Sequence, residues 1–206
     1  MAIPLALPND APQYVPVLQQ EIVQHWPSIP LPSVLAAQVE QESLWKVKAT
    51  LRNPKNNNEL GAGLGQFTKN NKFDALTEIK TQYPALFKEW SWNNPYDAQY
   101  QLRGVVVKNR DNFNRIKWAA TDYDRLAMMD SAYNSGYGGL LFRKRYCANL
   151  PNCNPGKWFG HMEYASTQSK KPQAGYKQSF ADITSTHVKN VMIVRRPKYT
   201  FMDGKK

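Results

Sequence analysis

Glu42 is the side chain of this sequence best placed for acid–base chemistry. It lies in a segment with helical periodicity from Val34 to about Lys48, for which Ser33 is the predicted N-cap. Residues at helical spacing from Glu42 form a mostly apolar stripe: Leu35, Gln38, Val39 and Trp45. We therefore expect Glu42 on the face that meets the core, and Glu40, about 200° around the helix, on the face that meets solvent.

Burial would suit this glutamate to proton transfer. An apolar environment disfavours a charged carboxylate, so a buried glutamate keeps its proton more readily and can act as a general acid. The same position also suits a structural glutamate that pairs with a lysine or an arginine. The helix alone leaves both roles open for Glu42.

Two further motifs follow along the chain. Gly61-Ala-Gly-Leu-Gly-Gln66 lies in a polar region, residues 49–66, which we expect to form loops or a small β-hairpin. Glycine lets the backbone approach a sugar ring closely, and it serves an ordinary turn equally well. Ala132-Tyr-Asn-Ser-Gly136 lies at the end of a predicted helix, where Tyr133 is equally suited to the core.

In this order, these motifs and the preceding Ala37-Gln-Val-Glu-Gln-Glu-Ser43-Leu-Trp45 resemble the lytic transglycosylase and goose-type lysozyme superfamily of peptidoglycan-cleaving enzymes. The resemblance covers roughly residues 30–140. It implies a mainly α, lysozyme-like α+β fold, in which a helical catalytic domain has a small loop or β-hairpin region at the cleft.

The resemblance also assigns roles to residues. It implies that Glu42 is the catalytic acid, with Ser43 beside it among the substrate-binding residues. Gly63 and Gln66 match the turn that lines the sugar cleft. Tyr133 and Asn134 match the segment that places an aromatic ring and an amide against the substrate.

The sequence departs from the family pattern at two points. The glycine motif is one residue shorter than usual, and Thr68 stands where goose-type lysozymes carry an aspartate. A hydrolase needs a second carboxylate about 5 to 9.5 Å from the acid. Without one, the family's alternative is a lytic transglycosylase, in which a single carboxyl acts as acid and then as base and leaves a 1,6-anhydro-MurNAc end. Glu59 and Asp74 are the alternative second carboxylates of a true hydrolytic lysozyme (muramidase).

Other elements must hold these motifs in place. Periodicity predicts helices over residues 15–26, 73–82, 95–117 and 122–134, and a short strand at 191–194. With 206 residues, 42% of them hydrophobic, the chain suits one compact domain. Within it we expect a Pro-rich lead-in over residues 1–30, a catalytic core over 31–140, and a basic extension over 141–206 packed on the core.

The positive charge lies almost wholly in the predicted extension. The net charge is +11, and residues 1–140 hold 14 basic and 13 acidic side chains, whereas residues 141–206 hold 13 and 3. Such a field attracts polyanions, unless the charges form an ordinary solvated face. Four residues are expected to bind anionic envelope polymers or lipopolysaccharide: Lys189, Arg195, Arg196 and Lys198. The sequence contains no known nucleic-acid-binding module, so we expect no specific nucleic-acid partner.

The remaining signals concern cysteines, metals and membranes. Cys147 and Cys153 are either disulfide-bonded or free, and their spacing from His161 matches no common zinc site, so we expect no metal and no cofactor. No stretch approaches the ~20 apolar residues of a transmembrane helix. The first ten residues lack a basic segment and contain Pro4 and Pro8, unlike a secretory signal.

With the resemblance, these features predict a phage endolysin that stays in the host cytoplasm until its release to the periplasm, or a virion-associated lysin. The alternative from another class is a non-enzymatic polyanion-binding protein.

Overall fold

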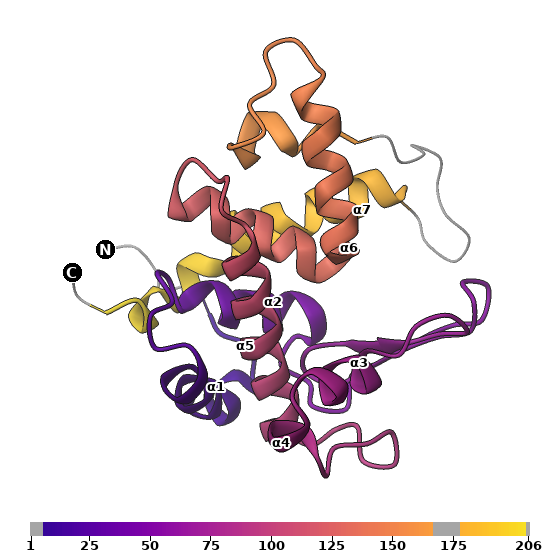
Figure 1. Cartoon of the computed structure of the whole chain (residues 1–206). Coiled ribbons are helices and arrows are strands. Elements are labelled where there is room, and N and C mark those ends of the chain that lie inside the picture. Colours follow the sequence, from indigo (N-terminus) through magenta and orange to yellow (C-terminus); the bar gives the residue numbers. More distant parts are fainter. Residues whose placement is uncertain (1–5, 167–177, 205–206) are drawn as a thin grey trace. The chain divides into compact units, whose positions relative to one another are not determined.

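A computed structural model of the chain describes residues 6–166 and 178–204 (Figure 1). The chain forms two compact units: unit 1 comprises Met1–Lys108 and Arg195–Lys206, and unit 2 comprises Asn109–Val194. The described residues are mainly helical with one small antiparallel sheet, which confirms the predicted mainly α, α+β class. This division differs from the predicted boundaries at residues 30 and 140. Residues 167–177 of the predicted extension lie outside the described part.

The helix predicted over residues 15–26 of the lead-in is present in unit 1 and starts earlier, at Ala11. Helix α1 (Ala11–His25) buries Val15, Leu18 and Ile22 completely or nearly so. Its buried Glu21 accepts a 3.0 Å hydrogen bond from Nε of Arg103 on helix α5 (Ala98–Arg115). Despite its prolines, this segment packs into unit 1, and α1 belongs to the core of that unit.

Helix α2 (Ser33–Ser43) is shorter than predicted and is buried on every side. It ends at Leu44, which takes a left-handed conformation with φ 52°. Every residue from Ser33 to Glu40 is buried, because the last helical segment, η3 (Arg196–Met202), packs along α2. Ser33 is not a side-chain N-cap. Its backbone N–H and hydroxyl both donate to the carboxylate of Asp203, at 2.8 and 2.7 Å.

The predicted β-hairpin region is confirmed. Strands β1 (Thr50–Asn53), β2 (Glu59–Ala62) and β3 (Phe67–Lys69) form an antiparallel sheet in sequential order. Thr50 pairs with Ala62, and Gly61 pairs with Thr68. Two short helices follow, α3 (Ala75–Gln82) and α4 (Pro84–Phe87), and α3 packs against β3. The glycine-rich motif therefore forms β2 and the turn into β3.

Unit 2 is built on helix α6 (Asp122–Ala148), which continues beyond the predicted end near residue 134. Gly136 kinks it, with φ 78° and ψ 152°, a conformation open almost only to glycine. Helix α7 (Phe180–Lys189) and the turn η1 (Trp158–Met162) pack on α6. The predicted strand at 191–194 is wrong, since these residues lie in the helical turn η2 (Asn190–Arg195). Within the described residues, no helix has the length and apolar character needed to cross a bilayer.

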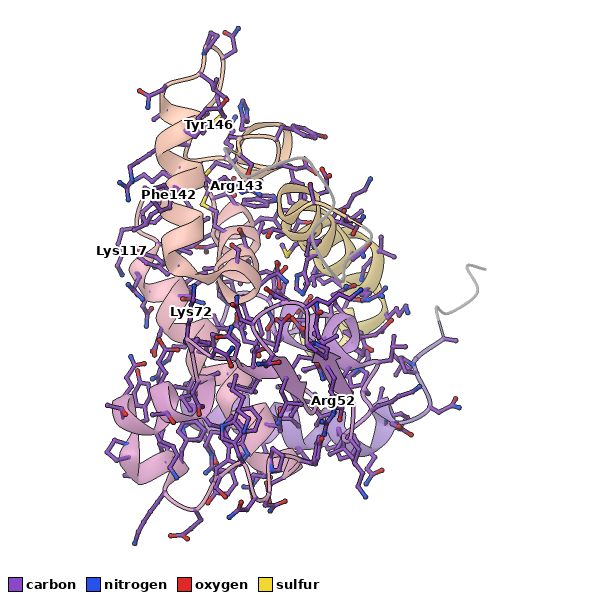
Figure 2. All side chains as sticks on the ribbon, turned by 90° about the vertical axis from the view of Figure 1, so that its right-hand side faces the viewer. Arg52, Lys72, Lys117, Phe142, Arg143 and Tyr146 are labelled. Carbon is purple, nitrogen blue, oxygen red and sulfur yellow. A yellow bond between two sulfur atoms is a disulfide. The ribbon has the colours of Figure 1, made fainter. Side chains whose placement is uncertain are left out.

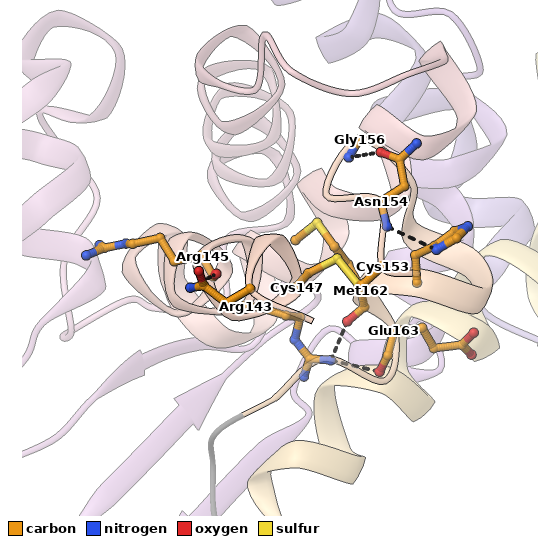
Figure 3. Close-up of a disulfide and its surroundings, with 10 residues drawn as sticks. Arg143, Arg145, Cys147, Cys153, Asn154, Gly156, Met162 and Glu163 are labelled. Atoms are coloured by element: carbon orange, nitrogen blue, oxygen red, sulfur yellow. Dashed lines mark hydrogen bonds between the residues drawn. A yellow bond between two sulfur atoms is a disulfide. The ribbon is translucent and has the colours of Figure 1, made fainter. Parts of the chain in front are cut away.

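A disulfide joins Cys147, at the end of α6, to Cys153, which decides between the two states left open by the sequence (Figure 3). It closes a short loop and thereby restricts the unfolded chain more than the folded one. The double substitution Cys147→Ser with Cys153→Ser should lower the free energy of unfolding by about 2 kcal/mol. Urea unfolding without reductant measures this. Equal stability of the oxidised wild type and the variant would contradict it.

Candidate functional site

The burial of the two glutamates of α2 differs from the prediction. Glu42 is half-buried near the C-terminal end of the helix, whereas Glu40 is 2% exposed. The prediction that Glu40 faces solvent is wrong, because η3 covers the side of α2 that carries it. The prediction assumed that one face of the helix meets solvent, but α2 has no such face between Ser33 and Glu40.

Glu40 is bound by residues of the chain's last segment. Nζ of Lys198 donates to Glu40 Oε1 at 2.6 Å, and the Tyr199 hydroxyl donates to Oε2 at 2.5 Å. Nε of Arg195 lies 4.0 Å from the same carboxylate. The Tyr199 oxygen accepts from Nε1 of Trp45 at 2.7 Å. Burial, together with the hydrogen bond to Glu40, raises the pKa of Tyr199, so its phenol stays protonated.

These contacts change the expected role of the basic extension. Arg195 and Lys198 neutralise Glu40, and Nη1 of Arg196 donates to Asp203 at 3.2 Å. Three of the four cations expected to bind polyanions are thus only about a fifth exposed and form ion pairs within unit 1. Lys189 is exposed, on α7.

The glycine turn is held by the side chain of Gln66. Its Nε2 donates to the carbonyls of Ala49 and Gly63, at 3.1 and 2.9 Å. A Cβ on Gly61 would lie 2.8 Å from Oε1 of Gln66, so this amide needs a glycine opposite it. Gln66 therefore links the turn to the segment that follows α2, and Gly63, with φ +77°, makes the turn itself.

Helix α5 clamps the same turn from the other side. Gln101 is fully buried, accepts from the N–H of Gly65 at 3.1 Å and donates to the carbonyl of Ala62 at 3.1 Å. A Cβ on Gly63 would lie 2.4 Å from the Gln101 amide. One turn along α5, a Cβ on Gly104 would lie 2.5 Å from the ring of Phe67. The fixed shape of the turn depends on α5, whose glutamine and glycine the sequence analysis missed.

Lys108 continues this face of α5 and was also missed. Its ammonium lies 6.0 Å from the centroid of the Phe67 ring. Burial lowers the pKa of Lys108, and the negative charges of Glu78 and Glu42 partly offset this effect. Glu42 and Lys108 therefore share one electrostatic environment. The sequence signal was a lone lysine on a helix face otherwise occupied by Gln101 and Gly104.

Ser43, Tyr133 and Asn134 have less direct positions. Ser43 is buried, and its hydroxyl donates to the carbonyl of Val39 at 3.0 Å, so it helps to end α2. Tyr133 is 8% exposed on α6. Asn134 is exposed, and its Oδ1 accepts from the Thr184 hydroxyl at 3.0 Å. The last two belong to unit 2, so the third motif is not part of the compact unit that contains Glu42.

The two alternative second carboxylates, Asp74 and Glu59, accept hydrogen bonds from neighbouring residues. Asp74 is the N-cap of α3, and its Oδ1 accepts from the N–H groups of Leu76 and Thr77, each at 3.0 Å. It also accepts from Nε1 of Trp92 at 3.0 Å. Burial alone would raise the pKa of Asp74, but hydrogen bonds from Thr77, Trp92 and Leu76 outweigh it and hold the pKa below its usual value.

Glu59 and Thr68 are bound in a similar local way. Nδ2 of Asn56 donates to Oε2 of Glu59 at 2.8 Å, in the turn between β1 and β2. The Thr68 hydroxyl donates to the carbonyl of Gln66 at 3.0 Å. In the described residues, no three His, Cys, Asp or Glu side chains are grouped to hold a metal ion.

A comparison of the sequence with models of known protein families and with curated proteins finds no match.

The unequal burial of Glu40 and Glu42 predicts unequal effects on stability. Glu40→Gln leaves Lys198 and Arg195 without a counter-charge in a buried place and should lower the free energy of unfolding by about 3 kcal/mol. Glu42→Gln, the matched control two residues on, should change it by less than about 1 kcal/mol. Urea unfolding of both variants tests this, and a similar loss in both would contradict it.

The cap of α3 predicts a pH-dependent contribution. Because the pKa of Asp74 is lowered on folding, its charge stabilises the folded state above the ordinary value of 3.8, and this contribution disappears as the pH falls through the lowered value. Asp74→Asn keeps a capping side chain and removes the charge. The variant should be less stable than wild type at pH 7 by up to about 1 kcal/mol, and the gap should close as the pH falls through the lowered pKa of Asp74. A gap that widens on acidification would contradict this.

Proposed function

We propose that this chain is a peptidoglycan-cleaving enzyme, a lytic transglycosylase that breaks the MurNAc–GlcNAc β-1,4 bond. The observation that carries the proposal is the placement of Glu42. It lies half-buried on helix α2, near Lys108. The same unit contains the glycine turn, to which helix α5 is hydrogen-bonded through Gln101. A half-buried carboxyl on a packed helix is placed for proton transfer to a glycosidic oxygen bound beside it.

The proposed reaction uses this carboxyl twice. Protonated Glu42 gives its proton to the glycosidic oxygen as the C1–O bond of the muramoyl residue breaks, and the substrate's own N-acetyl oxygen bonds to C1. The Glu42 carboxylate then takes the proton from the C6 hydroxyl, whose oxygen displaces the N-acetyl oxygen from C1. The product is a 1,6-anhydro-MurNAc end, and no water is consumed.

The hydrogen bonds of the other carboxylates support transglycosylation over hydrolysis. A muramidase needs a second carboxylate that can activate water or stabilise the sugar cation. Asp74 is taken up by the cap of α3 and by Trp92, and Glu59 is bound by Asn56. Thr68 takes the place of the aspartate found in goose-type lysozymes.

The proposed setting is a phage endolysin or a virion-associated lysin. The disulfide between Cys147 and Cys153 supports action in an oxidising compartment such as the periplasm. An endolysin made in the host cytoplasm would acquire the bond after its release.

The decisive variant is Glu42→Gln, which keeps the shape of the side chain but cannot carry the proton. Cleavage of purified sacculi should fall by ~10² or more, while circular dichroism stays unchanged. Glu59→Gln and Asp74→Asn are the matched controls and should keep most of the activity. Mass analysis of wild-type products should show 1,6-anhydro ends, which are one water lighter than lysozyme products. Full activity of folded Glu42→Gln would overturn the proposal. Reducing ends alone, with activity lost in either control, would identify a hydrolytic lysozyme.

A further inference from the structure

The part of α6 that follows the Gly136 kink has one buried face and one exposed apolar face. Leu140, Arg143 and Cys147 are buried at helical spacing. Between them, Phe142 is 64% exposed and Tyr146 is 37% exposed. Large apolar side chains on an otherwise polar surface mark a contact site when they are grouped with a consistent charge.

The charged residues of the two chain segments at this face are of one sign. Arg115, Lys117 and Arg145 are exposed, and Lys144 is half-buried. Residues 112–121 and 131–162 contain no aspartate or glutamate. Six residues make up what we call the α6 surface: Arg115, Lys117, Phe142, Lys144, Arg145 and Tyr146. In Figure 2, Lys117 and Phe142 lie on the side of α6 that faces away from α7.

The cations are associated with aromatic rings. The Arg115 guanidinium lies 3.7 Å from the centroid of the Tyr137 ring, and the Lys144 ammonium lies 4.1 Å from that of Trp118. The Arg145 guanidinium lies 5.0 Å from the centroid of the Phe142 ring. Each pair combines a positive group with an apolar plane, which is the combination that the headgroup boundary of a bilayer accommodates.

Contacts of the buried face of α6 fix this part of the helix in place. Nη1 of Arg143 donates to the carbonyls of Met162 and Glu163, at 3.0 and 2.8 Å (Figure 3), and to the Ser185 hydroxyl on α7. Burial lowers the pKa of Arg143 to about 10, so it remains charged at neutral pH. The disulfide of Cys147 fixes the end of the same helix. Little conformational freedom is then lost when the exposed face meets a partner.

We propose that the α6 surface docks on a membrane that contains anionic lipids. Phe142 and Tyr146 enter the interface, while Lys117, Lys144 and Arg145 contact headgroup phosphates. The basic character of the surface matches a phosphate-rich plane. Single-stranded nucleic acid also combines with cations and aromatic rings. The disulfide favours the lipid, because bonds of this kind persist in oxidising compartments, where membranes are the abundant phosphate-bearing surface.

The test is co-sedimentation of the full oxidised chain with vesicles of phosphatidylcholine, alone or mixed with phosphatidylglycerol, at low and high salt. We expect binding to the mixed vesicles only, and weaker binding at high salt. Phe142→Ser and Arg145→Ser should each lower the partition coefficient about fivefold or more. The matched control is Tyr164→Ser, an aromatic side chain 76% exposed in the same unit, which should bind like wild type. Circular dichroism confirms that each variant folds.

Three outcomes would overturn the proposal. The first is equal binding to vesicles with and without phosphatidylglycerol, or to neither. The second is an equal loss in the Phe142→Ser variant and the Tyr164→Ser control. The third is Phe142-dependent binding to a single-stranded oligonucleotide that exceeds binding to the vesicles.

The proposal stands apart from the proposed enzyme activity. Glu42→Gln should bind vesicles like wild type, and Phe142→Ser should cleave soluble glycan fragments like wild type.

Discussion

The buried carboxylate of Glu40 fixes helix α2 against the segment that follows residue 194. Glu40 has almost no contact with solvent, and a charge in that position is tolerated only because Lys198, Tyr199 and Arg195 are brought to it. The same segment supplies Asp203 to the first turn of α2, where a negative group meets the unpaired N–H groups of the helix. Both ends of α2 are thus fixed by residues more than 150 positions away, and the position of Glu42 follows from them.

The glycine turn has a comparable dependence on α5. Gln101 replaces the hydrogen bonds that the turn cannot make within the sheet, and the absence of a side chain at Gly104 admits the ring of Phe67. Residues 61–65 are all buried, and the fully buried amide of Gln101 fixes their backbone from within the unit. The arrangement explains how the turn between two short strands keeps one shape.

Local sequence patterns predicted where the helices and strands form better than they predicted what packs around them. The helical periodicity near Glu42 and the glycine-rich region after it predicted a helix and a hairpin, and both are present. The orientation of α2 could not be predicted, because the partners of Glu40 lie at the other end of the chain. For the same reason the ion pairs of Arg195, Arg196 and Lys198 could not be predicted. Glycine at position 136 correctly indicated a break but not that α6 resumes after it, since an interruption in periodicity does not show whether buried contacts continue beyond it.

The dependence of α2 on Asp203 has a consequence for synthesis. While the ribosome is still translating unit 2, α2 lacks both the carboxylate at its start and the partners of Glu40. Unit 2, which is one continuous stretch of chain, has no such delay. The nascent protein should therefore complete its inserted unit first and close unit 1 only after the last helical segment leaves the exit tunnel. An unfinished chain would then carry Glu42 on a helix that is not yet fixed.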